Sequence, residues 1–251
     1  MIPQKLKVIH LILPVFVCLG LAPMVQAVGP DTDGSIAGAN NGEGVGVLIN
    51  RTTGIWNTGT GFEALNHLTA GNQNTATGLR ALFSDINGGF NTATGVYALF
   101  SNTSGFFNSA TGANSLTRNT VGSNNTANGY SALYFNTTGD RNTAVGVQAL
   151  NRNTTGFINT ASGYQALYSN TIGTGNTANG AGALFNNNEG DQNTATGYST
   201  LTGNTTGFGI QVAPFGGTDR RLAATATAGL AVLLRLAERS VRHRLPMRLD
   251  F

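Results

Sequence analysis

From residue 142 the chain reads Asn142-Thr143-Ala144-Val145-Gly146-Val147-Gln148-Ala149-Leu150, and Asn153-Thr154-Thr155-Gly156 follows shortly after. The same pattern recurs every 17 residues, without insertion or deletion, in nine clear units. These units begin at Asn57, Asn74, Asn91, Asn108, Asn125, Asn142, Asn159, Asn176 and Asn193. A degenerate unit that begins at Asn40 keeps Gly44, Leu48 and Gly54 in phase. Residues 40–209 therefore form one repeat array, and the array decides the fold.

Comparison of the units with one another separates the predicted interior from the predicted surface. The fifth and fifteenth positions are always glycine in the clear units, and the ninth is always leucine, whereas the seventh varies freely. We predict that the ninth-position leucines form the structural core of the repeat: Leu65, Leu82, Leu99, Leu116, Leu133, Leu150, Leu167, Leu184 and Leu201. We predict that the fifth-position glycines lie at turns: Gly61, Gly78, Gly95, Gly112, Gly129, Gly146, Gly163, Gly180 and Gly197.

The length of the unit predicts the fold class. Seventeen residues are too few for two helices and a turn, and a leucine-rich repeat is longer and carries several leucines per unit. A short unit rich in Gly, Asn and Thr is typical of one coil of an all-β, parallel β-solenoid, with about ten coils here. We expect two short strands per coil, joined by two tight turns. At both invariant glycines the backbone could then take positive φ, which a residue without Cβ adopts freely.

Energetics require the coils to stack. One coil buries about one leucine and two alanines, and burial of a leucine contributes roughly 1.5–3 kcal/mol, whereas ordering each residue costs about 1–2 kcal/mol. Stacking adds backbone ladders, and asparagines at the first and most twelfth positions would add side-chain amide ladders. Aromatic residues recur at the sixth and tenth positions. They could join chains through an apolar face or simply cover a monomeric coil.

The units resemble the head repeats of trimeric autotransporter adhesins of the YadA type. The matching residues are, for example, Asn159-Thr160-Ala161-Ser162-Gly163-Tyr164-Gln165-Ala166, with Asn159 in place of a serine. They are also similar to the Asn-Thr-Ala-Thr-Gly and Asn-Thr-Thr-Gly arrays of tail-fibre-like bacterial surface proteins. The resemblance covers residues 40–209. It implies a left-handed β-roll or β-helix, a homotrimer and a role in adhesion to a host, matrix or polysaccharide surface.

The N-terminus is typical of a secretory signal peptide, which we place at residues 1–27. Lys5 and Lys7 supply the positive region, and residues 8–21 supply an apolar stretch shorter than the about 20 residues of a membrane span. Val25-Gln26-Ala27 is the expected cleavage site. Residues 28–39, rich in Gly, Pro and Asp, are a predicted lead-in linker. We therefore expect a secreted or cell-surface protein, associated with an outer membrane.

Residues 210–251 form a different segment, rich in Arg and Leu. Where a further unit should begin with Asn-Thr, the chain continues Ile210-Gln211-Val212. Loss of one base from codons for Gly-Asn-Thr-Gly gives Gly-Ile-Gln-Val, so one hypothesis is that this tail is a frameshifted end. Further 17-residue units in another frame of the gene would support it. The other hypothesis is a genuine basic helix from Leu222 to Arg244 that contacts a membrane or a partner.

The repeat offers little chemistry. His67 is its only histidine, its acidic residues occupy scattered positions, and Cys18 lies in the predicted signal peptide. Seven of the 14 Lys and Arg residues lie in the last 32 residues, so the array carries no basic footprint for nucleic acid. We predict a structural or adhesive surface rod rather than an enzyme, with no catalytic, cofactor or metal site.

One alternative function comes from the threonines. Thr75-Ala76-Thr77, Thr92-Ala93-Thr94 and Thr194-Ala195-Thr196 place two hydroxyls on one side of a predicted strand. Stacked on a flat sheet, such pairs could order water and bind ice. The second threonine is replaced in other units, by Asn128, Val145, Ser162 and Asn179. Because a surface that matches a lattice should vary less, adhesion is the preferred prediction.

Overall fold

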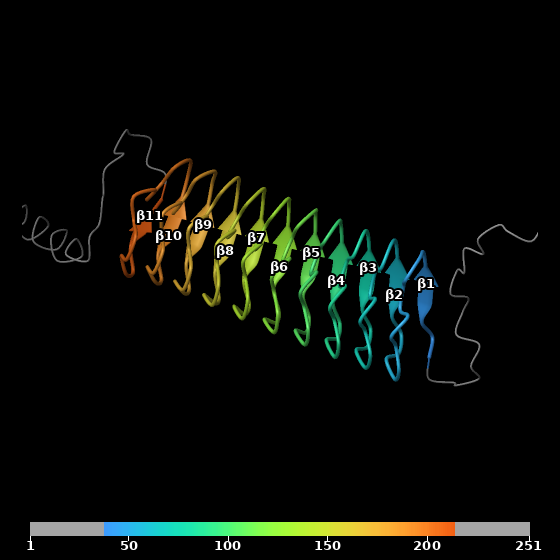
Figure 1. The fold of residues 1–251 in the computed structure, drawn as a ribbon. Helices are drawn as coiled ribbons and strands as arrows, with labels where there is room; N and C mark the ends of the chain where they lie inside the picture. Colours follow the sequence, from blue (N-terminus) through green and yellow to red (C-terminus); the bar gives the residue numbers. More distant parts are fainter. Residues whose placement is uncertain (1–37, 214–251) are drawn as a thin grey trace, which may run out of the picture.

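The computed structural model describes residues 38–213, which form one parallel sheet of eleven short strands in sequence order (Figure 1). Each strand pairs with the equivalent strand one unit along the chain, so the backbone climbs as a solenoid of about ten coils. The predicted parallel β-solenoid with a 17-residue repeat is confirmed. The strands are β1 (Asn41–Glu43), β2 (Thr58–Thr60), β3 (Thr75–Thr77), β4 (Thr92–Thr94), β5 (Ser109–Thr111), β6 (Thr126–Asn128), β7 (Thr143–Val145), β8 (Thr160–Ser162), β9 (Thr177–Asn179), β10 (Thr194–Thr196) and β11 (Gln211–Val212).

The strands lie in register because their residues alternate between the two sides of the sheet. In β3 and β4, Ala76 pairs with Ala93, and both are buried while the flanking threonines are exposed. A slip by one residue would place the hydroxyls in the core and the alanines in water. The unbroken 17-residue spacing therefore fixes the register along the whole sheet.

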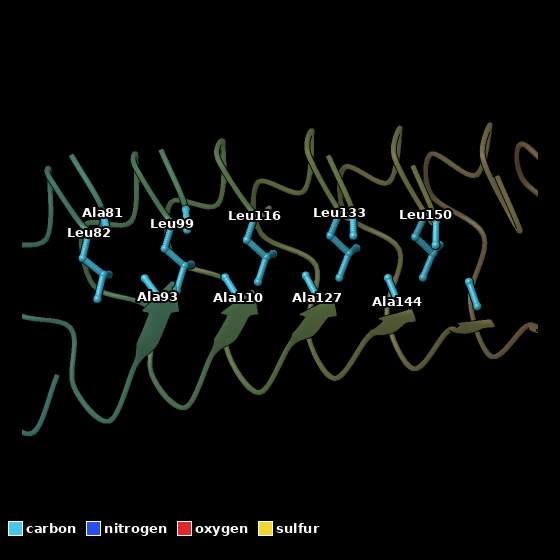
Figure 2. Close-up of a cluster of buried hydrophobic side chains, with 14 of the residues drawn as sticks. Ala81, Leu82, Ala93, Leu99, Ala110, Leu116, Ala127, Leu133, Ala144 and Leu150 are labelled. Carbon is cyan, nitrogen blue, oxygen red and sulfur yellow. The ribbon is translucent and has the colours of Figure 1, made fainter. Parts of the chain in front are cut away.

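The core is a narrow double column that runs the length of the solenoid. Figure 2 shows alanines such as Ala110 and Ala127 pointing from the strands toward the leucines Leu116 and Leu133 on the opposite side of each coil. These side chains and the eighth-position alanines are buried in a single cluster. Because each coil adds only one leucine, its stability comes from contacts with the coils on either side.

The expectation of two strands per coil is wrong. Positions six to eleven form a continuous turn instead of a second strand. In that turn, alternate residues have left-handed backbone conformations, as at Arg80 (φ 52°) and Leu82 (φ 50°), and extended chain requires negative φ. The turn still bonds between coils, since Leu82 N–H donates to Ala98 O at 3.0 Å. Only the strand side of each coil is therefore a sheet.

Left-handed residues without glycine recur at the seventh, ninth and seventeenth positions. This conformation costs an L-residue about 1–2 kcal/mol. We expect Arg141→Gly, at an exposed seventeenth position with φ 55°, to be more stable than Arg141→Ala by about 1 kcal/mol, as measured by urea denaturation. Both variants remove the same side chain, and only glycine relieves the backbone. Equal stabilities would contradict the left-handed assignment.

The two invariant glycines have different roles, which corrects the expectation that both take positive φ. The fifth-position glycines do so, with φ between 117° and 137° in the nine clear units. The fifteenth-position glycines do not. At Gly156, a Cβ would instead clash with the carbonyl oxygen of Gly173 in the next coil and with the Asn153 side chain. Close approach of neighbouring coils, rather than backbone conformation, requires glycine there.

Two buried asparagine ladders support the stack. At the first position, Asn142 Oδ1 accepts the backbone N–H of Asn159 in the next coil at 3.0 Å, and Asn142 Nδ2 donates to Gly156 O at 2.8 Å. At the twelfth position, Asn153 Nδ2 donates to Asn136 Oδ1 in the preceding coil at 2.7 Å. These bonds satisfy polar groups that would otherwise be buried without partners.

The sheet continues past the last full repeat unit. Strand β11 pairs with β10, and Ile210 N–H donates to Asn193 Oδ1 at 3.0 Å, so Ile210 takes the place of the next ladder asparagine. Ile210 and Val212 also pack against the core. The predicted signal peptide and most of the predicted linker and tail lie outside the described residues.

Candidate functional surfaces

The outer side of the sheet carries two parallel columns of short polar side chains. The second position of each coil from 57 onward is threonine or Ser109, and the strand pairing places these residues side by side in register. At the fourth position, β2 to β5 all end in threonine, whereas β6 to β9 carry Asn128, Val145, Ser162 and Asn179. The hydroxyl pairs are therefore continuous only over the first four of these coils.

An exposed apolar column runs beside the sheet at the sixth position of every coil. We call it the sixth-position column, and its members are Val45, Phe62, Leu79, Val96, Ala113, Tyr130, Val147, Tyr164, Ala181 and Tyr198. The eight larger members are 37–79% exposed. At about 4.8 Å per coil, the column is about 45 Å long. Ten successive coils thus leave apolar side chains in water along one line, which is typical of an interaction surface.

A second group of aromatic residues, at the tenth and eleventh positions, packs against itself. The rings of Phe83 and Phe100 are stacked with centroids 5.2 Å apart, and those of Tyr168 and Phe185 are 5.1 Å apart. Arg118 lies over the Phe135 ring, 4.8 Å from its centroid. These aromatics are half-buried. They stabilise contacts between coils, which leaves the sixth-position column as the more exposed apolar surface.

The titratable groups of the array are few. Glu63 and Arg80 form an ion pair at 2.6 Å between seventh positions of adjacent coils. Asp85 is buried, and desolvation raises the pKa of its carboxyl to about 7 despite hydrogen bonds from Asn102 and Gly88. Within residues 38–213, no cluster of three or more His, Cys, Asp or Glu side chains could hold a metal ion. The same residues include no helix of the length and hydropathy that crossing a membrane requires.

The residues singled out from the sequence lie where the repeat brings them. The nine leucines line the core, with only Leu201 in the last full coil slightly exposed. The fifth-position glycines form a column in which each lies against the backbone of the next. Asp85 was not singled out. The signal was its place in the twelfth position, where the seven following coils carry asparagine.

Comparisons with known proteins identify no relative: no family model, no curated protein and no solved structure matches the chain. The geometry of the solenoid surfaces and the sequence resemblance to adhesin head repeats therefore carry the functional argument.

Proposed function

We propose that this protein is an exported bacterial surface protein whose rigid, non-catalytic β-solenoid acts in adhesion as a homotrimer. The observation that carries the proposal is the unbroken sixth-position column. An isolated chain would expose this column to water along its whole length, so burial against other copies is favourable. Export is inferred from the signal peptide predicted at residues 1–27, and the trimer from the resemblance to YadA-type heads.

The size of the column suits an interface between copies. Stable interfaces bury roughly 800 Å² per partner. A strip about 45 Å long needs a width of about 18 Å to reach that area, so the column would be joined by parts of its flanking positions. Repetition also suits adhesion. Equivalent surface positions recur every coil and again in every copy, which raises avidity for a repetitive polymer without strong individual contacts.

The oligomer is tested by a charge placed in the column. Val147, in the sixth-position column, and Val145, on the strand face of the same coil, are 42% and 43% exposed. We expect Val147→Glu to dissociate the trimer and Val145→Glu to leave it intact, because only the first buries a charge at the interface. Sedimentation equilibrium of the full chain measures both. A monomeric wild-type chain, or equal effects of the two variants, would contradict the proposal.

Adhesion itself is tested by binding. The purified chain is applied to immobilised extracellular-matrix proteins, to polysaccharides and to cultured host cells, and retention is compared with that of Val147→Glu. We expect retention on at least one of these surfaces, weakened in the variant because avidity falls with the number of joined copies. Retention on none of them would reduce the role of the solenoid to that of a spacer.

The hydroxyl columns favour ice binding as a second candidate function. Thr58 and Thr60, Thr75 and Thr77, Thr92 and Thr94, and Ser109 and Thr111 form four adjacent pairs on a flat face. Neighbouring pairs are about 4.8 Å apart, the spacing of a sheet. A thermal hysteresis assay separates the two functions. Thermal hysteresis that is lost in Thr77→Asn would favour ice binding over adhesion.

A further inference from the structure

Asp85 interrupts the twelfth-position ladder at its N-terminal end. In coils 91–107 and beyond, this position is asparagine, and each Nδ2 donates to the residue of the preceding coil and, in most coils, to the glycine carbonyl three residues later. In the coil before Asp85, the position is the buried, apolar Leu68. The carboxyl thus lies between an amide that can bond to it and a hydrocarbon side chain that cannot.

The two carboxyl oxygens of Asp85 have unequal surroundings. Oδ1 accepts hydrogen bonds from Asn102 Nδ2 and from the backbone N–H of Gly88, both at 3.0 Å. Oδ2 is the one buried side-chain polar atom without a hydrogen-bond partner within residues 38–213. Where other coils have an amide that donates to a glycine carbonyl, an ionised carboxylate offers only acceptors, and a protonated one regains a donor.

No charge near Asp85 compensates its ionisation. The titratable side chains of the adjacent coils are Glu63 and His67 on one side and Tyr97 on the other, and Arg80 lies in the same coil. Arg80 pairs with Glu63, and the His67 ring packs on Phe83. In the twelfth-position column the nearest cation is Arg51, two coils away beyond Leu68, where its Nη1 donates to Gly54 O. The carboxyl is therefore stabilised mainly by its protonated form.

We propose that Asp85 makes the contact between coils 57–73 and 74–90 sensitive to protons, so that ionisation loosens the three N-terminal coils, residues 40–90, from the rest of the solenoid. Each coil touches only its neighbours, so the cost of a buried carboxylate falls on these contacts and not on the whole array. Residues 40–90 are at one end of the repeat, where a small group of coils can open without disturbing the other seven.

The direction of the pH effect follows from linkage. Burial raises the pKa of Asp85 from 3.8 to about 7, so the folded coils bind the proton more tightly than the unfolded chain does. Stability from this group is highest below pH 4, falls as the pH rises toward 7, and is constant at its lower value above that. Between pH 5 and pH 8, this shift corresponds to an increase on the order of a hundredfold in the opening equilibrium.

Amide hydrogen exchange of the full chain tests the proposal. After correction for intrinsic exchange rates, protection of residues 40–90 should fall on the order of a hundredfold between pH 5 and pH 8, while residues 125–209 stay unchanged. Asp85→Asn, which restores the ladder amide, should abolish this fall. A wild-type chain with equal protection at both pH values, or an Asp85→Asn chain with the same fall, would overturn the proposal.

The reciprocal variant tests the position rather than the residue. Asn136 is also buried in the twelfth-position ladder, in the middle of the array. In a chain that carries Asp85→Asn together with Asn136→Asp, the pH-dependent loss of protection should move to residues 125–141 and their neighbours. If the loss stayed in residues 40–90, another group would be its cause. Should the double variant not fold, the comparison of wild type with Asp85→Asn still decides.

Discussion

Alanine in place of Gly146 should destabilise the protein by about 3–5 kcal/mol. The expected loss has two parts. Gly146 has φ 133°, a region that costs an L-residue about 1–3 kcal/mol. Its added Cβ would also lie 2.5 Å from the carbonyl oxygen of Gly163 in the next coil, and overpacking of this kind costs about 1–3 kcal/mol. Urea denaturation of the full chain, followed by circular dichroism, measures the loss.

Gly203 is the matched control for Gly146. A Cβ at Gly203 would meet no atom within 4 Å, and its φ lies outside the left-handed region. We expect Gly203→Ala to leave stability unchanged or to raise it by about 0.4–1 kcal/mol, because alanine restricts the unfolded chain. Similar losses in both variants would show that the column of fifth-position glycines is not a site of close contact.

Leucine in place of Asn142 should be the second severe change, with a loss of about 2–4 kcal/mol. The side chains are similar in size, but leucine removes the acceptor of the Asn159 N–H and one of the two amide donors to Gly156 O. A buried donor left without a partner costs about 1–3 kcal/mol, and the lost second bond adds about 1 kcal/mol. Denaturant titration of the variant gives the difference from wild type.

Asn128 provides the comparison for Asn142. It lies at the exposed end of β6, on the outer side of the sheet. Asn128→Leu should change stability by less than about 0.5 kcal/mol, as is usual for surface sites. If the two substitutions had equal effects, the first-position ladder would contribute no more than an exposed amide does.

The sequence predicts the solenoid because every level of its pattern agrees. The spacing fixes which residues neighbour each other, and the alternation around Ala144 fixes which side of the strand faces inward. The buried ladders follow from the same spacing, since Asn142 and Asn159 must then lie one above the other. The sixth-position column could also be placed from the sequence, although its exposure had to be measured in the structure.

The turn side of the coil could not be predicted in the same way. Nothing in the residue type of Leu150 or Arg141 marks a left-handed backbone, because these side chains disfavour it and only the stacked coils impose it. The fifteenth-position glycines were recognised as invariant for the wrong reason, since the distance between coils is not visible in one unit. Asp85 was passed over because its pKa depends on burial and on Leu68, which lies 17 residues earlier.

The identical step between coils gives the rod a quantised length. Deletion or duplication of one whole unit, such as residues 125–141, joins a first-position asparagine to the same surroundings that it had before. DNA that encodes near-identical units is prone to slippage, so alleles of different length can arise without loss of fold. Each would differ in reach by about 4.8 Å per unit. The repeat therefore acts as a heritable ruler, in which selection can set how far the rod extends without redesigning any contact within it.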